Sequence, residues 1–244
     1  MINFKNMSDF LGENFDLLAG VNDIREKTIL CGYEKNPGGM DVVSGGYLYL
    51  ILKKIQPMLF LESGIWRGYS SMIFDSINDY GASHYLFDPG IRDANFMNLL
   101  KYKVNKGHYH DADIGSSLFS SIGRNGTFFF DDHQDQLERL LIAFSRGAKY
   151  AIFDDNYMFG GGGHSSLFDH FRQGRNSTLL NAIVDSVYIA QPLLTKNKGI
   201  EPLFNTENEI DIDLIKYDAN FQWLTLVKLK EIDSISKSQG SIKF

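Results

Sequence analysis

The sequence predicts an α/β fold in which helices cover both faces of a mostly parallel sheet. Short apolar runs alternate with helix-like segments from Pro57 to Tyr157. Alternation at this spacing implies parallel strands joined by right-handed helical crossovers. The run Thr127–Phe130 has no alternation of apolar and polar residues, which is typical of a strand covered on both faces.

The expected elements follow one another in a regular order. The first ~35 residues carry apolar positions at helical spacing and end at the breaker Asn36–Gly39. Expected helices then cover 45–57, 69–77, 94–103, 135–147 and 177–187. The apolar runs with their closing turns cover 57–63, 84–90, 107–113, 127–133 and 149–157, and a closing strand lies within 221–230. For 45–57 the β-branched and aromatic content would also suit a strand.

Composition and charge narrow the class of protein. Hydrophobic residues make up 43% of the 244 positions and charged residues 22%, as in ordinary folded soluble proteins. The formal net charge of −6 argues against a protein that grips nucleic acid along its phosphates. Cys31 is the single cysteine, so no intrachain disulfide forms. The N-terminus lacks a signal-peptide core, and no window approaches the ~18 apolar residues of a membrane span. We expect a soluble, cytoplasmic protein that binds neither nucleic acid nor membrane.

Acidic residues follow the expected strands. They are Glu62, Asp88, Asp111 or Asp113, the pair Asp131–Asp132 and the pair Asp154–Asp155. Ligands of open parallel sheets bind outside the carboxyl ends of the strands, and carboxylates there hold hydroxyls, an ammonium group or a metal ion. Taken singly, each acid could instead cap a helix or a turn. The ordered set predicts a binding site at this edge.

Two glycines follow the first strong strand, where it turns into a helix. Gly64 and Gly68 remove side chains at this turn, so we expect a ligand to approach the backbone there. Their spacing differs from the dinucleotide fingerprint and from the phosphate loop, so a pyrophosphate is not the favoured ligand. Asp88 lies 24 residues after Gly64, near where an acid would bind ribose hydroxyls. A nucleoside without a phosphate cradle indicates S-adenosylmethionine.

The segment Leu61–Ser71, "LESGIWRGYSS", resembles the cofactor loop of class I S-adenosylmethionine-dependent methyltransferases. The catechol O-methyltransferase and related metal-dependent O-methyltransferases carry Glu-x-Gly-x-x-x-Gly-Tyr-Ser there. They also carry Asp-His after the fourth strand and Asp-Asn after the fifth, as Asp132–His133 and Asp155–Asn156 do here. The sugar and macrolide O-methyltransferases of antibiotic pathways, and the so-called cephalosporin hydroxylase group, are also similar. The resemblance covers about residues 40 to 160.

This resemblance implies a Rossmann-like fold with a mostly parallel seven-stranded sheet. The sequence has no internal repeat and no linker-like boundary, so we expect one domain over 1–244, with a helical N-terminal extension at 1–39, a cofactor- and metal-binding core at 40–160, and a lid, substrate region and closing strands at 161–244. The implied cofactor-binding residues are Glu62, Gly64, Trp66, Gly68, Tyr69, Ser70, Asp88, Asp113, Asp131 and His133. The implied Mg²⁺ ligands are Asp132, Asp155 and Asn156, and the loop from Met40 to Val43 would touch the cofactor.

The chain departs from the catechol enzyme at the general base. That enzyme has a lysine just after its Asp-His pair, whereas Gln134 and Asp135 stand here. His133 is the catalytic candidate if no metal binds, because a neutral imidazole titrates near working pH. A cofactor contact or a helix-start position is the competing interpretation of His133. Asp132 is the second catalytic candidate, but either acid of each Asp pair could face the site.

The expected function is metal-assisted O-methylation of a hydroxylated small molecule such as a sugar, a polyol or a natural product. One alternative is a metal-independent N-methyltransferase, and another is a non-catalytic binding subunit with the same fold. The glycine run at 157–166 fits either a lid or a disordered loop. Trp66 could pack against the ligand or against a second subunit, so a homodimer is one of the alternatives for the oligomeric state.

Overall fold

An eight-stranded sheet in the order β1-β7-β10-β6-β5-β2-β3-β4 runs through the centre of the computed structural model. The structure describes residues 2–33, 39–91, 93, 98–154, 156, 163–172, 177–190, 193–196, 199–202 and 224–232. The strands of the sheet are β1 (Asn3–Asn6), β2 (Leu59–Ser63), β3 (Ser83–Phe87), β4 (His108–His110), β5 (Thr127–Phe130), β6 (Tyr150–Phe153), β7 (Val184–Ile189) and β10 (Thr225–Leu229). A separate antiparallel pair consists of β8 (Leu193–Lys196) and β9 (Gly199–Pro202).

The sheet is parallel except at β10, which runs antiparallel to both of its neighbours, β6 and β7. From β2 the chain moves outward through β3 and β4, then returns to the other side of β2 with β5 and β6. The order therefore reverses between β2 and β5. Ligands of open α/β sheets bind at such a switch point, beyond the carboxyl ends of the strands.

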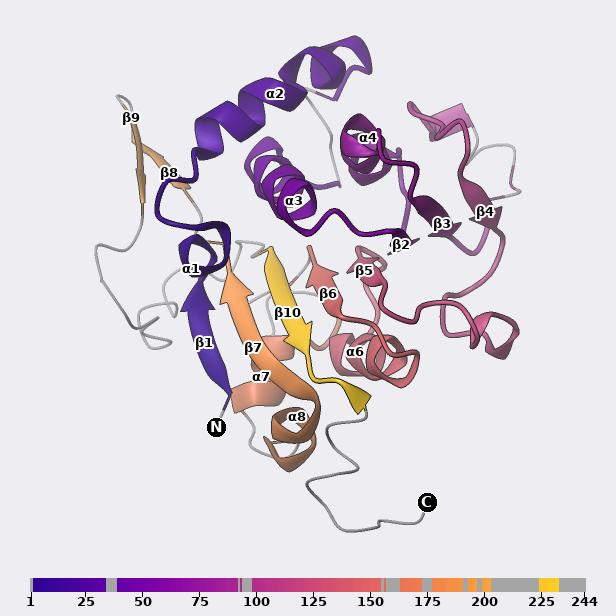
Figure 1. Cartoon of the computed structure of the whole chain (residues 1–244). Helices are drawn as coiled ribbons and strands as arrows, with labels where there is room; N and C mark the ends of the chain where they lie inside the picture. Colours follow the sequence, from indigo (N-terminus) through magenta and orange to yellow (C-terminus); the bar gives the residue numbers. More distant parts are fainter. Residues whose placement is uncertain are drawn as a thin grey trace.

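Helices cover both faces of the sheet (Figure 1). One side carries α1 (Met7–Leu11), α2 (Leu17–Leu30), α3 (Val42–Ile55) and α4 (Tyr69–Ile77), and the other carries α6 (Gln136–Ser145), α7 (Leu167–Arg172) and α8 (Ser177–Ile183). A short 3₁₀ turn, η1 (Ser117–Phe119), follows β4. In β5, Phe128 and Phe130 pack into the core beside α6, whereas Phe129 packs into the core beside α3 and α4. This burial on both faces explains the unbroken apolar run that the sequence shows at β5.

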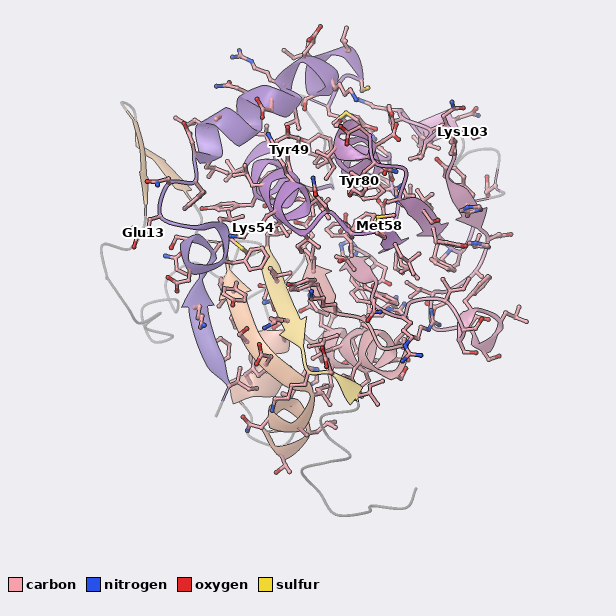
Figure 2. The ribbon with its side chains drawn as sticks, viewed as in Figure 1. Glu13, Tyr49, Lys54, Met58, Tyr80 and Lys103 are labelled. Carbon is pink, nitrogen blue, oxygen red and sulfur yellow. The ribbon has the colours of Figure 1, made fainter. Side chains whose placement is uncertain are left out.

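The helix α2 packs on the outer side of α3, with α3 between it and the sheet in Figure 1. Gly46 makes the close approach of these two helices possible, because a Cβ there would lie 2.5 Å from Cγ2 of Val21. Midway along the two helices, Tyr49 of α3 donates its hydroxyl hydrogen to Asp23 of α2 at 3.1 Å, and Figure 2 labels Tyr49. The helical extension expected from the sequence is thus held to the core by α3.

The predicted fold class is confirmed, with three differences in detail. The sheet has eight strands where seven are expected, because β1 pairs in parallel with β7 and forms its edge. The N-terminal extension is therefore not wholly helical. The helix expected at 177–187 ends at Ile183, since the segment from Val184 to Ile189 is rich in β-branched and aromatic residues and forms β7. Of the described helices, none combines the length and the apolar character needed to cross a membrane.

A hollow of about 1160 Å³ lies at the N-terminal edge of the parallel strands, opposite the edge where the acidic residues gather. The residues just before β2, β5 and β6 line it, together with residues after the antiparallel β10. Figure 2 labels two of its lining residues, Lys54 and Met58. This hollow is therefore remote from the predicted cofactor site.

Candidate functional site

The candidate site is the C-terminal edge of the parallel strands around β2. Backbone hydrogen bonds continue past the strand ends and draw the predicted residues together. The amide of Gly64 donates to Phe87 O at 3.0 Å, and the amide of Asp131 donates to Ser63 O at 2.9 Å. The amide of Asp88 donates to His110 O at 3.2 Å. The turns that follow β2, β3 and β5 therefore meet at one place, as the sequence predicts.

The turn after β2 requires glycine for a reason that the sequence does not reveal. Gly64 has a φ of 86°, and a Cβ on it would lie 2.5 Å from the Asp131 carbonyl carbon and closer still to its oxygen. Gly68 has a φ of 87°, and a Cβ there would lie 2.5 Å from Tyr102 O. In each case the backbone that approaches the glycine belongs to the protein itself. The expected close approach of a ligand is thus not what makes these two glycines necessary.

Asp88 closes β3 and holds the glycine turn. Its Oδ2 accepts the Ile65 N–H at 3.0 Å. Burial raises the pKa of the Asp88 carboxyl above its usual value, while the amides of Ile65 and Trp66 act in the opposite direction. Trp66 is 39% exposed and has a φ of 45°, so its side chain stands at the surface of the turn. Asp88 and Trp66 therefore lie side by side at the turn, and their contact with a nucleoside stays a prediction.

Glu62 supports the turn from inside the protein. Its side chain is fully buried and accepts hydrogen bonds from Ser70 Oγ at 2.5 Å and from Ser71 Oγ at 2.8 Å. The Nε2 of His84, on β3, lies 2.9 Å from Glu62 Oε2. Glu62 and Ser70 were predicted to bind the cofactor, and a direct contact would require them to give up these buried partners. Their place in the structure ties the start of α4 to β2 and β3.

Tyr69 also lies inside the protein, at the first position of α4. It is 3% exposed, and its ring centroid is 4.9 Å from that of Tyr33. The predicted cofactor contact of Tyr69 therefore stays a prediction, and the structure gives this ring a packing role against the N-terminal extension. Met40, in the loop expected to touch the cofactor, is 2% exposed.

Arg139 of α6 joins two of the predicted acids. Its Nη1 and Nη2 donate to Oδ1 and Oδ2 of Asp113 at 3.0 and 2.6 Å. Its Nε lies 2.8 Å from Asp132 Oδ2, in an ion pair whose N–H direction departs from that of an ideal hydrogen bond. Ser63 Oγ donates to the same Asp132 oxygen at 2.5 Å. The loops after β4 and β5 are thus held together by one buried guanidinium.

The pKa values of Asp113 and Asp132 are shifted in opposite directions. The hydrogen bonds from Arg139 lower the pKa of Asp113, whose side chain is 47% exposed. Burial raises the pKa of Asp132, whose side chain is only 12% exposed, although Arg139 and Ser63 oppose that rise. Desolvation is the larger effect at Asp132 because water reaches it far less than it reaches Asp113.

His133 stands exposed just before α6 with a φ of 54°. Its ring centroid lies 5.8 Å from that of His164, in an edge-on arrangement. The Nε2 of His164 lies 3.5 Å from Nε2 of Gln136, and a third histidine, His170, lies 3.2 Å from Asp135. His133 therefore belongs to a group of imidazoles around the N-terminus of α6, and Asp131 precedes it at the end of β5 in a partly exposed position.

The predicted magnesium ligands do not form a recognisable metal site in the described part of the chain. Asp155 lies outside the described residues, as do residues 157–162 of the glycine run at 157–166. Asn156 is fully buried, and its Nδ2 donates to Thr225 Oγ1 at 2.7 Å, while its Oδ1 is buried and has no hydrogen-bond partner among the described residues. Asp132 Oδ2 is already held by Ser63 and Arg139. Among the described residues no group of three His, Cys, Asp or Glu side chains could hold a metal ion.

A free buried amide oxygen fits a cation, but a carboxylate paired with a guanidinium does not. The described residues therefore do not fit Mg²⁺ at Asp132.

The sequence interpretation missed Arg139, Ser63, Ser71, His84 and His164. A signal for Arg139 was present. The buried positions of α6 are Gln136, Arg139, Leu140 and Ala143, which follow the i, i+3, i+4, i+7 spacing of one helix face. A charged residue on the buried face of a helix needs a partner of opposite charge, and the acids after β4 and β5 are the available ones.

Solved structures with a similar fold are known. An O-methyltransferase assigned in Klebsiella pneumoniae superposes with a TM-score of 0.50 at 13% sequence identity, over 86% of this chain and 90% of that one. A protein of Staphylococcus aureus assigned as a caffeoyl-CoA O-methyltransferase gives a TM-score of 0.50 at 14% identity, over 86% of this chain and 92% of that one. No protein-family model matches the sequence, and a search of curated proteins finds no match. The chain therefore has the class I methyltransferase fold.

Proposed function

We propose that this protein is an S-adenosylmethionine-dependent methyltransferase that acts on a hydroxyl group of a small molecule. The observation that carries the proposal is the junction of the glycine turn after β2 with Asp88 at the end of β3. This junction lies at the point where the strand order reverses, and the fold is that of class I methyltransferases. The names of the two similar structures, both assigned as O-methyltransferases, favour oxygen as the methyl acceptor.

Several residues of the turn fit a nucleoside. Asp88 offers a carboxylate for ribose hydroxyls, and its partial burial strengthens such hydrogen bonds. Trp66 offers a partly exposed aromatic face. The bound donor would supply a methyl group for in-line displacement, in which the acceptor oxygen forms a bond to the methyl carbon while the carbon–sulfur bond breaks and the sulfur leaves as a neutral thioether. The contribution of the protein is then chiefly to align the acceptor, and such positioning can supply ~7–11 kcal/mol.

His133 is the proposed general base. It is exposed at the edge that Asp88 and the turn also occupy, and a neutral imidazole can take the proton of a hydroxyl acceptor. His164 lies beside it and can orient the ring. Asp132 has a raised pKa, but its oxygen is held by Ser63 and Arg139, which favours a supporting role for it.

The ion pair of Asp132 with Arg139 favours a metal-independent form of this reaction, with His133 as the base. The metal-assisted reaction stays a prediction that depends on Asp155, which lies outside the described residues. A non-catalytic binding subunit differs from both candidates only in lacking turnover.

Titration calorimetry with S-adenosylmethionine tests the proposal. We expect micromolar binding by the full chain, and at least tenfold weaker binding by Asp88→Ala, because the ribose would lose a charged acceptor. Asp79→Ala is the matched control, since Asp79 is an exposed acid in the turn before β3 and should bind as wild type does. Absence of binding by the wild-type chain, or equal weakening by both variants, would contradict the assigned pocket.

A further inference from the structure

Arg139 is a buried cation with no direct role in the proposed reaction. Its side chain is only 4% exposed, and a guanidinium is rarely buried to this extent unless it is paired with groups of opposite charge. Three of its nitrogens lie within 3.0 Å of carboxylate oxygens, two from Asp113 and one from Asp132. One positive charge thus faces two negative charges at the edge of the sheet where the site lies.

The Arg139 guanidinium lies against Asp132, which the sequence resemblance implies to be a Mg²⁺ ligand. In the metal-dependent relatives that the sequence resembles, the corresponding Asp would be a Mg²⁺ ligand. Here Asp132 Oδ2 accepts Ser63 Oγ and pairs with Arg139 Nε, and Asp132 Oδ1 accepts the Gln134 N–H at 3.3 Å. A guanidinium remains protonated at any working pH, so it repels a second cation at the same oxygen at all times.

Arg139 also determines where two loops lie. The loop after β4 belongs to the edge strand, which is separated from β5 by β2 and β3. The guanidinium on α6 holds Asp113 of that loop by two parallel hydrogen bonds, and it holds Asp132 of the loop after β5 through Nε. Bidentate pairing fixes orientation as well as distance. The two loops that flank the glycine turn are therefore placed relative to one another by a single side chain.

We propose that the guanidinium of Arg139 is the cation of this site. It pairs with Asp132 in place of a divalent metal, and it positions the loops after β4 and β5 around the donor. Asp132 is then a positioning residue and not a metal ligand. The metal part of this inference concerns the protein alone, whereas the positioning part rests on the proposed function.

Titration of the protein with Mg²⁺ alone tests the metal part. We expect no Mg²⁺ binding at Asp132 in the wild type, and so the same titration curve for wild type and Asp132→Asn. Arg139→Gln leaves Asp113 and Asp132 without their cation, and we expect it to gain Mg²⁺ binding and a melting temperature that rises with added Mg²⁺. Wild-type Mg²⁺ binding that Asp132→Asn abolishes would overturn the inference.

Binding of S-adenosylmethionine tests the positioning part. We expect the dissociation constant to rise at least tenfold in Arg139→Gln and less in Arg139→Lys, which keeps the charge but loses the bidentate geometry. Arg124→Gln is the control, because Arg124 lines the hollow at the opposite edge of the sheet. EDTA should not change the wild-type constant.

Three outcomes separate the possibilities. If Arg139→Gln keeps the wild-type dissociation constant, the positioning role is wrong. If Arg139→Gln does not fold, Arg139→Lys and Asp132→Asn still test both parts. If the wild type binds no S-adenosylmethionine, the proposed function and the positioning role fail together, and the Mg²⁺ titration still decides the metal part.

Discussion

Gly64 shows at the scale of one residue that the fold itself can require the glycine of a turn that is also expected to hold a ligand. The glycine is needed because the Asp131 backbone approaches it and because its φ is positive. Both needs come from the fold, so a nearby ligand is not required to explain the residue. The same sequence pattern therefore has a structural cause that operates with or without a bound cofactor.

Replacing Gly64 by alanine should destabilise the protein for two separable reasons. The left-handed backbone costs about 1–2 kcal/mol for a residue with a Cβ, and the overlap with Asp131 adds about 1–3 kcal/mol. Gly81→Ala is the matched control, since Gly81 has a φ of 78° and no atom within 4 Å of a built Cβ. Thermal melting should place Gly64→Ala below Gly81→Ala by several degrees. Equal melting temperatures would show that the Asp131 backbone moves away at little cost.

Asp113 predicts a pH dependence of stability. Its pKa is lower in the folded protein than the unperturbed value of 3.8, chiefly because of Arg139. Its stabilising contribution is therefore complete above pH 3.8 and is lost as the pH falls through the lowered folded pKa. We expect Asp113→Asn to melt below wild type at pH 7, and the gap to narrow under strongly acidic conditions. Melting curves from pH 7 downward measure this, and a gap that widens on acidification would contradict it.

The helix α3 illustrates the scale of the element, since its start is fixed by one side chain. Asp41 Oδ1 accepts the Val43 and Ser44 amides at 2.7 and 2.9 Å, and Asp41 Oδ2 accepts Ser44 Oγ at 3.0 Å. An acid at this position satisfies helix N–H groups that have no partner inside the helix. The cap thereby positions the loop that precedes α3, which includes the buried Met40.

Asp41→Ala should lower the free energy of unfolding by about 1 kcal/mol. Asp41→Asn should lose less, because the amide oxygen still accepts from the backbone and only the charge near the helix N-terminus is removed. Urea unfolding of the two variants measures the difference. If alanine and asparagine cost the same, the cap hydrogen bonds seen at Val43 and Ser44 contribute little to stability.

Sequence periodicity predicted the elements more completely than the site. The apolar runs at β2, β5 and β6 identified the central strands because burial on both faces excludes polar residues there. The strand β1 was missed because four residues rich in asparagine carry no such pattern, and only the exposed edge of β7 makes them a strand. Val184–Ile189 was partly assigned to a helix because a short segment at a helix end satisfies either period.

The site was harder to predict because partners come from distant parts of the chain. The acids at the strand ends were found from their positions, since parallel strands bring their carboxyl ends together. Which group each acid meets depends on helix rotation and on loop paths, which periodicity does not specify. Arg139, His84 and Ser71 reach Asp132 and Glu62 from other elements, and these contacts became evident only in three dimensions.

At the scale of the whole molecule, the two edges of the sheet differ in character. The edge beyond the carboxyl ends of β2, β3 and β5 gathers acids and one buried arginine. The opposite edge carries the hollow lined by Lys54, Arg124 and Lys149. A donor that carries a positive sulfonium is expected at the acidic edge, in agreement with the proposed function.

The antiparallel strand β10 has a consequence for the order in which this protein can be made. It lies between β6 and β7, which do not pair with each other, so both strands lack a neighbour until residues 225–229 have been synthesised. The strand β7 also pairs with β1, so its two neighbours are the first and the last of the described strands, as Figure 1 shows. At a translation rate of roughly 5–20 residues per second, β1 waits about ten seconds or more for β7 to be synthesised. A nascent chain held on the ribosome can thus assemble β2 to β6 early. The strands β1, β7 and β10 can join the sheet only after the segment that carries β10 leaves the exit tunnel.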